Sequence, residues 1–181
     1  MKNYIAILVT LFSTIICNGQ VRKTKWGMNK QQVIATEDLK PSMNNQTGLA
    51  YNVNLAGLDN YLFYFFNPDG KLAAAAYNLS EKYASDNSYL SAYIDLLAKL
   101  KEKYGEGVPD IKWSNDLYKD DKQKWGLAIA AEHLTIANRW ETDDTYIVAE
   151  ISGKNYETTV AIRYTSKNIV YKQKKNELDD F

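Results

Sequence analysis

The spacing of apolar residues predicts a short helix near the start of the folded part of the chain. Asn29 is a typical helix-capping residue, and Gln32 stands three positions further on, where a capping-box partner belongs. The helix is expected over about residues 30–38, and Pro41 then stops it.

Three strands are predicted next. Large apolar residues alternate with small or polar ones over 49–55, which is the period-two pattern of a half-buried strand. The aromatic run at 61–66 has the high strand propensity of side chains that fit a pleated surface. The sequence Asn-Pro-Asp-Gly at 67–70 places proline and glycine where a tight turn needs them, and it leads into a third strand over 72–79.

From about residue 87 to 104 the apolar spacing changes to that of one helix face. Asp86 can cap the start of this helix, and Gly105 can close its end. Lys101 and Lys103 suit the negative C-terminal end of the helix dipole. We expect this helix to be the longest one and to cover the sheet. Its apolar positions are Leu90, Tyr93, Ile94, Leu97, Leu100 and Tyr104.

The last third of the chain again predicts strands. A polar connector with Pro109 and Trp113 follows the long helix. The stretch 122–132 favours a second, shorter helix, with a strand as the alternative reading. Gly153-Lys154-Asn155 indicates a tight hairpin connection between the last two strands. The three strands expected here cover 134–141, 146–152 and 156–165.

The predicted fold class is α+β, with antiparallel sheet packed on helices. The element order is one helix, three strands, one or two helices and three strands, and its two similar halves suggest an internal duplication. Antiparallel pairing follows from the short connections, since parallel strands need long crossovers. We expect a single domain over residues 20–171 and a charged C-terminal tail over 172–181.

Residues 1–19 have the pattern of a secretory signal peptide. Lys2 is followed by a mainly apolar run from Tyr4 to Ile16, and Gly19 offers a small residue for cleavage. The run is shorter than the roughly twenty residues that a membrane span needs, so we expect no membrane span. The predicted location is the periplasm or the outside of the cell.

Cys17 raises the alternative of a lipid anchor, because a cysteine at the end of an apolar leader can be acylated. The acylation signal wants a small residue just before the cysteine and a leucine-like residue three before it. Ile16 and Thr14 occupy those two places, which argues against a lipid anchor on Cys17. Cleavage after Gly19 would leave no cysteine, and so neither disulfides nor thiolate chemistry.

Charge and residue types exclude several kinds of function. The chain has 22 Lys and Arg against 22 Asp and Glu, so it lacks the basic excess of nucleic-acid binders. His133 is the only histidine, which leaves no histidine pair for a metal. No sequence signature supplies a nucleophile and an orienting group beside it. We therefore predict no catalytic, metal or cofactor site.

Acidic residues form two groups. Asp116, Asp120 and Asp121 lie among lysines in a connector without the alternating ligands and bend glycine of a calcium loop, so a solvated loop is expected. Glu141 with Asp143 or Asp144 could act as an acid and base pair on a glycoside, although such residues are usually only turn residues.

Aromatic residues make up 13% of the chain, including four Trp. Exposed aromatics on a sheet can stack on sugars or anchor a protein partner, because they give a large contact area at little entropy cost. Most of the Trp side chains are expected to fill the core. The candidate residues for an aromatic binding surface are Trp113, Trp125 and Trp140.

The stretch Trp26-Gly27-Met28-Asn29, with Val33 behind it, resembles the W-G-M-S/N-x-x-x-V opening of small uncharacterised exported bacterial proteins. Three further stretches look like the same group, namely Lys103-Tyr104-Gly105, the Trp-Gly-Leu-Ala-Ile segment at 125–129 and the Trp-Glu-Thr strand end at 140–142.

More distantly, a helix opened by G-M-x-x-x-x-V and followed by antiparallel strands is similar to the periplasmic modules of the β-lactamase-inhibitor and outer-membrane-assembly lipoprotein type. Those families bind other proteins and catalyse nothing, so the resemblance implies a fold and a general role. It transfers no functional residue. The chain departs from these families in lacking a lipobox and the G-x-P that usually closes their first helix.

Together these observations predict an exported, non-enzymatic binding module that uses one face of an antiparallel sheet against a protein partner in the cell envelope. The alternative is a carbohydrate-binding or weak glycoside-processing protein with exposed aromatics and paired carboxylates. A third hypothesis is a purely structural component of the envelope.

Overall fold

The computed structural model describes residues 21–170. The predicted signal peptide at 1–19, Cys17 and the predicted tail at 172–181 lie outside these described residues. No helix within the described part is long and apolar enough to cross a membrane.

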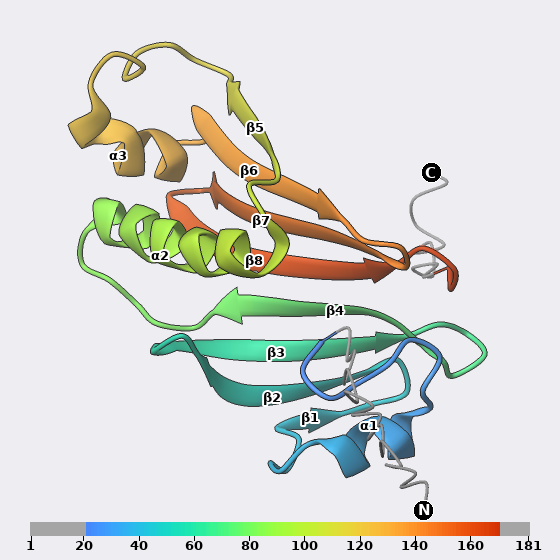
Figure 1. The fold of residues 1–181 in the computed structure, drawn as a ribbon. Coiled ribbons are helices and arrows are strands. Elements are labelled where there is room, and N and C mark those ends of the chain that lie inside the picture. The colour runs from blue at the N-terminus through green and yellow to red at the C-terminus, as the bar shows by residue number, and fades with distance from the viewer. Residues whose placement is uncertain (1–20, 171–181) are drawn as a thin grey trace, which may run out of the picture.

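In the part of the chain that the structure describes, eight strands form one sheet in which every neighbouring pair is antiparallel (Figure 1). The spatial order is β1-β2-β3-β4-β8-β7-β6-β5. The strands are β1 (Met43–Asn44), β2 (Gly48–Leu55), β3 (Leu58–Phe66), β4 (Leu72–Leu79), β5 (Val108–Trp113), β6 (Leu134–Glu141), β7 (Thr145–Lys154) and β8 (Glu157–Ser166).

Within the described residues three α-helices accompany the sheet, and the α+β class is confirmed. They are α1 (Lys30–Thr36), α2 (Asp86–Tyr104) and α3 (Trp125–Ala130). In α1 the expected capping box is present, because Gln32 N donates to Asn29 Oδ1 and Asn29 N donates to Gln32 Oε1, both at 2.9 Å. Asp86 is the first residue of α2, so Ser85 holds the N-cap position that the sequence assigned to Asp86.

Two segments of the C-terminal half, 122–132 and the connector with Pro109 and Trp113, bear on the sequence predictions. The segment at 122–132 contains a short 3₁₀ turn (Lys122–Lys124) and then α3, so the helix reading is confirmed and the strand reading is wrong. The connector with Pro109 and Trp113 is in fact the edge strand β5. Its exposure pattern has no period-two alternation, because only β6 pairs with it and little of it is buried. The segment is a strand because it pairs with β6, and its local sequence does not predict a strand.

The two halves of the chain share one topology. In each half a helix precedes four strands, and the four strands lie in chain order from an outer edge towards the middle of the sheet. The halves join where their last strands, β4 and β8, pair through residues 74–78 and 161–165. This arrangement agrees with the duplication that the element order suggests.

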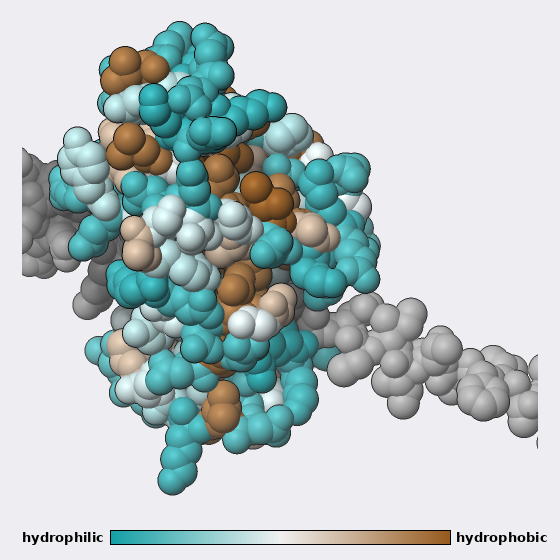
Figure 2. All heavy atoms as spheres, turned by 90° about the vertical axis from the view of Figure 1, so that its left-hand side faces the viewer, coloured by the Kyte–Doolittle hydropathy of each residue, from teal (hydrophilic) through white to brown (hydrophobic). Residues whose placement is uncertain are grey.

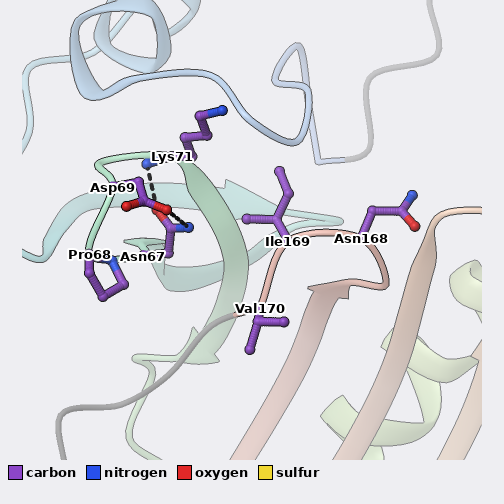
Figure 3. Close-up of a pocket in the computed structure, with 7 residues that line it drawn as sticks. All are labelled: Asn67, Pro68, Asp69, Lys71, Asn168, Ile169 and Val170. Atoms are coloured by element: carbon purple, nitrogen blue, oxygen red, sulfur yellow. Dashed lines mark hydrogen bonds between the residues drawn. The ribbon is translucent and has the colours of Figure 1, made fainter.

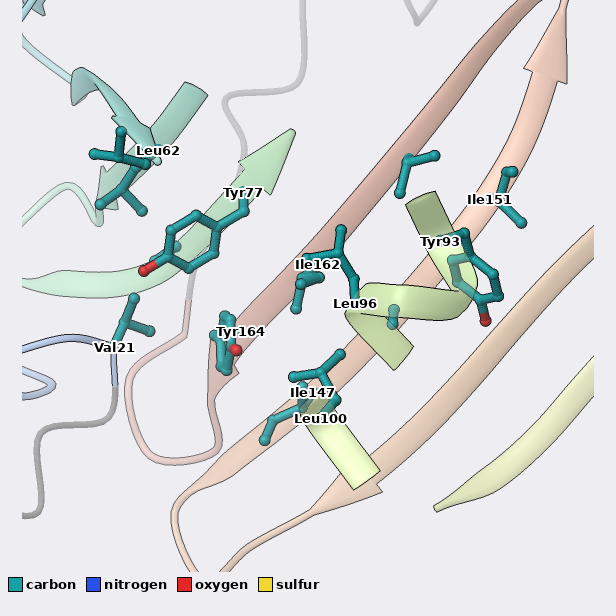
Figure 4. Close-up of a cluster of buried hydrophobic side chains, with 14 of the residues drawn as sticks. Val21, Leu62, Tyr77, Tyr93, Leu96, Leu100, Ile147, Ile151, Ile162 and Tyr164 are labelled. Carbon is teal, nitrogen blue, oxygen red and sulfur yellow. The ribbon is translucent and has the colours of Figure 1, made fainter. Parts of the chain in front are cut away.

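Helices α2 and α3 lie on the same face of the C-terminal half of the sheet, α2 over β7 and β8 and α3 over β6 and β7. Leu96 and Leu100 of α2 point towards Ile147 and Ile162 of the strands (Figure 4). Alternation along each strand brings these apolar residues to one face, and burying them supplies the main driving force for folding.

The N-terminal segment covers the same face of the other half through a buried polar cluster. Glu37, just after α1, has a side chain only 1% exposed, and its Oε2 lies 3.0 Å from Nε of Arg22. The hydroxyl of Tyr64 on β3 donates to Glu37 Oε1 at 2.5 Å. Burial and this hydrogen bond raise the pKa of Tyr64 well above its usual range. The cluster fastens residues 21–37 to the sheet.

Candidate functional site

The two faces of the sheet differ in what covers them. Side chains of Leu62, Tyr64 and Phe66 on β3 point towards the helices and are buried. Their alternating neighbours Tyr61, Phe63 and Phe65 point to the opposite side, which we call the outer face. None of the three described helices packs on the outer face, because α1, α2 and α3 all contribute to the other side.

The outer face of the N-terminal half carries an aromatic ridge, defined as Tyr61, Phe63 and Phe65. The ring centroids of Tyr61 and Phe63 are 6.3 Å apart, and those of Phe63 and Phe65 are 6.1 Å apart and stacked. Asn52 and Asn78 stand opposite Tyr61, whereas small, buried residues stand opposite Phe63 and Phe65 on both neighbouring strands. These small neighbours are Gly48 and Ala50 on β2 and Ala74 and Ala76 on β4.

The outer face of the C-terminal half is different, because cross-strand ion pairs occupy it. Arg163 lies 3.4 Å from Glu150, and Arg139 lies 2.7 Å from Asp110. Lys112 also contacts Asp110 at 3.2 Å, and hydrogen bonds from Arg139 and Lys112 lower the pKa of Asp110. These charges face water and neutralise one another. This half of the outer face also carries one exposed ring, Tyr146 on β7, whereas the three neighbouring rings on β3 form a continuous column.

The side of the molecule that faces left in Figure 1 includes α3 and the start of α2. Seen from the side that faces left in Figure 1, hydrophobic residues surface as separate patches among hydrophilic ones (Figure 2). Ile94 of α2 and Leu127 of α3 are exposed on these helices. Single exposed apolar residues of this kind are normal on soluble proteins and define no site.

The three tryptophans expected at an aromatic binding surface lie on the helix side of the sheet. Trp140 is only 7% exposed, and its Nε1 donates to the carbonyl oxygen of Gly105 at the end of α2 at 2.8 Å. Trp113 and Trp125 pack edge to face with centroids 5.7 Å apart and are partly buried against the core. These three rings fix α2 and α3 to the sheet and contribute nothing to the outer face.

The aromatic ridge had a signal in the sequence. The run Tyr-Leu-Phe-Tyr-Phe-Phe at 61–66 is apolar at both sets of alternating positions, so both faces of that strand carry apolar side chains. The described helices lie on the side of Leu62, Tyr64 and Phe66, so the second set lies on the opposite face of the sheet.

His133 and the aspartates of the acidic loop each contact neighbouring side chains of the fold. The His133 ring stacks on Tyr118 with centroids 5.8 Å apart. Asp116 and Asp121 form ion pairs with Lys119 and Lys124 within the loop, at 3.2 and 3.1 Å. Within residues 21–170, no three His, Cys, Asp or Glu side chains form a group that could hold a metal ion.

The carboxylates considered for glycoside chemistry belong to the β6–β7 turn and its surroundings. Glu141 lies 2.5 Å from Lys167, and Asp144 Oδ1 accepts hydrogen bonds from Thr142 and Thr145. Thr145 also accepts a 2.8 Å hydrogen bond from Trp26 Nε1, which links the N-terminal segment to β7. These contacts stabilise the turn and do not assemble an acid and base pair.

A shallow pocket of about 490 Å³ lies between the β3–β4 turn and the segment after β8 (Figure 3). Asn67 Oδ1 accepts from Lys71 N at 2.9 Å, and Asn67 Nδ2 donates to Asp69 at 3.4 Å. The side chains of Asn67 and Asp69 are thus engaged in the turn itself. Ile169 and Val170 form its other wall.

Comparison with known proteins gives no further assignment, since no family model matches the chain and no curated protein or solved structure matches it significantly. The class that the described residues define is an α+β module with one helix-covered sheet face and one outer face carrying an aromatic ridge.

Proposed function

We propose that this protein is an exported, non-enzymatic interaction module that binds a protein partner in the cell envelope through the outer face of its sheet. The observation that carries the proposal is the aromatic ridge. Three rings stand in one column on β3, on a face that no described helix covers. Glycine and alanine flank Phe63 and Phe65, and an asparagine stands on each side of Tyr61.

The chemistry of the ridge suits a protein contact. Phenylalanine and tyrosine rings bury a large area at a small cost in side-chain entropy, and such rings dominate the energetics of many interfaces. Tyr61 is exposed and Phe63 and Phe65 are half-buried, so apolar side chains of a partner can pack against the solvent-facing part of the ridge. The ion-paired C-terminal half gives this contact a polar border.

Two features of the sequence support the location and the kind of partner. The leader at residues 1–19 directs the chain out of the cytoplasm. The balance of basic and acidic residues gives no general attraction to nucleic acid or to an anionic membrane surface.

Site-specific photocrosslinking in the native cell tests this function. Phe63, in the middle of the ridge, is replaced by benzoylphenylalanine, and Ile94 on the exposed side of α2 is replaced in a control variant. Irradiation is expected to give a discrete protein adduct from position 63 and none from position 94. Phe63→Thr, which keeps strand propensity, should reduce recovery of the same partner in affinity purification.

An adduct from position 94 alone, or no adduct from position 63 in cells that export the protein, would contradict the proposal. Far-UV circular dichroism of Phe63→Thr must match that of the unmodified protein, so that lost recovery reflects a lost contact.

A further inference from the structure

A hollow of about 390 Å³ lies on the outer face at the end of the β2–β3 hairpin, next to the exposed end of the aromatic ridge. Its size falls within the range of small-molecule sites. Tyr61 is the most exposed ring of the ridge and forms one wall, with 46% of its surface accessible. The remaining lining residues are almost all polar, and they are Asn52, Val53, Asn54, Asp59, Asn60 and Ser80.

The register of the sheet places an amide on each side of the Tyr61 ring. Asn52 on β2 stands opposite Tyr61, and Asn78 on β4 stands opposite it on the other side. Neither amide side chain hydrogen-bonds to another described residue. Each amide offers two donors and an acceptor to a ligand resting on the ring.

The acidic group of the hollow is held in place by its neighbours. Asn54 Nδ2 donates to Asp59 Oδ1 at 3.1 Å, and Asn54 Oδ1 accepts from Gly57 N at 3.0 Å. The backbone N of Asp59 donates to Glu81 at 2.9 Å, and Tyr83 donates to the other oxygen of Glu81 at 2.6 Å. Asp59 Oδ2 has no partner among the described residues, so it remains available as an acceptor.

This set of groups selects a class of ligand. The face of the Tyr61 ring can stack on the apolar face of a ring in the ligand. The amides both donate and accept hydrogen bonds and the Asp59 carboxylate accepts them, so together they can bind hydroxyl groups of the ligand. The lining contains no Lys, Arg or His, so nothing there favours a phosphate or a carboxylate. The hollow is open and mostly polar, which does not suit a wholly apolar ligand.

We propose that this hollow is a binding subsite for a neutral saccharide ring, which stacks on Tyr61 and hydrogen-bonds to Asn52 and Asp59 in the lining. Asn78 does not line the hollow but stands next to Tyr61 on β4, where it can bind the edge of the same ligand. The subsite does not depend on the protein contact proposed above. That contact is tested at Phe63 in the middle of the ridge, and the subsite is tested at Tyr61 and its amides.

The test is a titration followed by ¹⁵N NMR, on protein expressed with its own leader and purified after export. The probes are glucose, galactose, mannose and N-acetylglucosamine at millimolar concentrations, together with a disaccharide of each. At least one probe is expected to shift the side-chain amide signals of Asn52 and Asn78. Tyr61→Ala should weaken that binding by about tenfold, because the stacking contact is lost.

Two further variants separate the subsite from general effects. Tyr61→Phe keeps the ring and should retain most of the affinity. Tyr146→Ala removes a similarly exposed ring, 49% accessible, from the other half of the outer face and should leave binding unchanged. Tighter binding of a disaccharide supports the subsite and assigns it to a glycan chain, whereas equal binding supports it and assigns it to free sugar.

The proposal is overturned if no probe shifts the amide signals of Asn52 and Asn78. It is also overturned if Tyr61→Ala, with an otherwise unchanged spectrum, binds the same sugar as tightly as the unmodified protein. A failed crosslink at position 63 would leave these two outcomes unaffected.

Discussion

Tyr77 on β4 and Tyr164 on β8 meet edge to face across the join between the two halves of the sheet, with ring centroids 6.3 Å apart and ring planes at 75°. The register places them diagonally, because Tyr77 stands opposite Ile162 and Tyr164 opposite Ala75. Both rings are buried on the helix side (Figure 4). The contact between Tyr77 and Tyr164 joins the buried residues of the two halves into one continuous core.

Replacing either ring should therefore destabilise the whole domain. Tyr77→Ala and Tyr164→Ala are each expected to lower the free energy of unfolding by about 3 kcal/mol, through lost burial and the cavity left behind. The double variant should show a coupling of about 1 kcal/mol between the two rings. Urea denaturation measures both quantities. Tyr156→Ala, in the exposed β7–β8 turn, serves as the control and should change stability little.

The partly buried ion pair between Arg22 and Glu37 leads to a prediction about stability. Glu37→Gln would leave Arg22 without its carboxylate partner and weaken the hydrogen bond from Tyr64. We expect a loss of about 2 kcal/mol, which is less than for a fully buried pair because Arg22 is one-third exposed. The matched control is Asp38→Asn, which breaks the solvent-exposed pair with Lys23. If both variants lose the same stability in urea, the buried cluster does not fasten the N-terminal segment.

Alkaline pH should unfold the protein through its buried tyrosines. Burial raises the pKa of Tyr77 to about 12, and burial also raises that of Tyr93 to about 12. In the unfolded chain both phenols have the ordinary tyrosine pKa of about 10. Between pH 10 and 12 the folded state therefore holds protons that the unfolded state releases. The stability that these groups contribute is present below pH 10 and is lost as the pH rises towards 12.

Urea denaturation at a series of alkaline pH values measures this loss, and near-UV absorbance follows phenolate formation. Tyr77→Phe cannot ionise, so its stability should fall less steeply above pH 10 than that of the unmodified protein. Parallel pH profiles for the two proteins would show that Tyr77 does not contribute to alkaline unfolding.

A further prediction concerns Gly153, where α3 packs closely on β7. A Cβ added to Gly153 would lie 1.9 Å from the carbonyl oxygen of Ile129 and 2.9 Å from Cα of Ala130. Gly153→Ala must therefore push α3 away from the strand, at a cost of about 2 kcal/mol in the free energy of unfolding. Ser152→Ala, one residue earlier on the same strand, should stay within about 0.5 kcal/mol. Thermal unfolding compares the two variants.

The sequence predicts the elements whose patterns are local. The helix at Asp86–Tyr104 has apolar residues spaced along one face, and the hairpin through Asn67 to Gly70 has its turn residues in place, so both could be recognised without knowing the rest of the fold. β5 could not be recognised, since it is an edge strand paired only with β6 and has no apolar alternation.

The outer face shows why the site was harder to predict than the fold. Alternation separates Tyr61, Phe63 and Phe65 from their neighbours, but it does not say which set meets the helices. That choice depends on the N-terminal segment, which packs on β3 through Glu37 and its partners Arg22 and Tyr64. Trp113 and Trp140 were likewise candidates for the surface, although both face the helices.

The β4–β8 pairing has a consequence for assembly. Each half is one uninterrupted stretch of chain, and the pairing of residues 74–78 with 161–165 brings them together. Two copies of the chain can thus exchange their C-terminal halves and rebuild the same pairing between molecules, leaving the strand ladders inside each half intact. The connection from β4 to α2, residues 80–85, would act as the hinge of such a domain-swapped dimer.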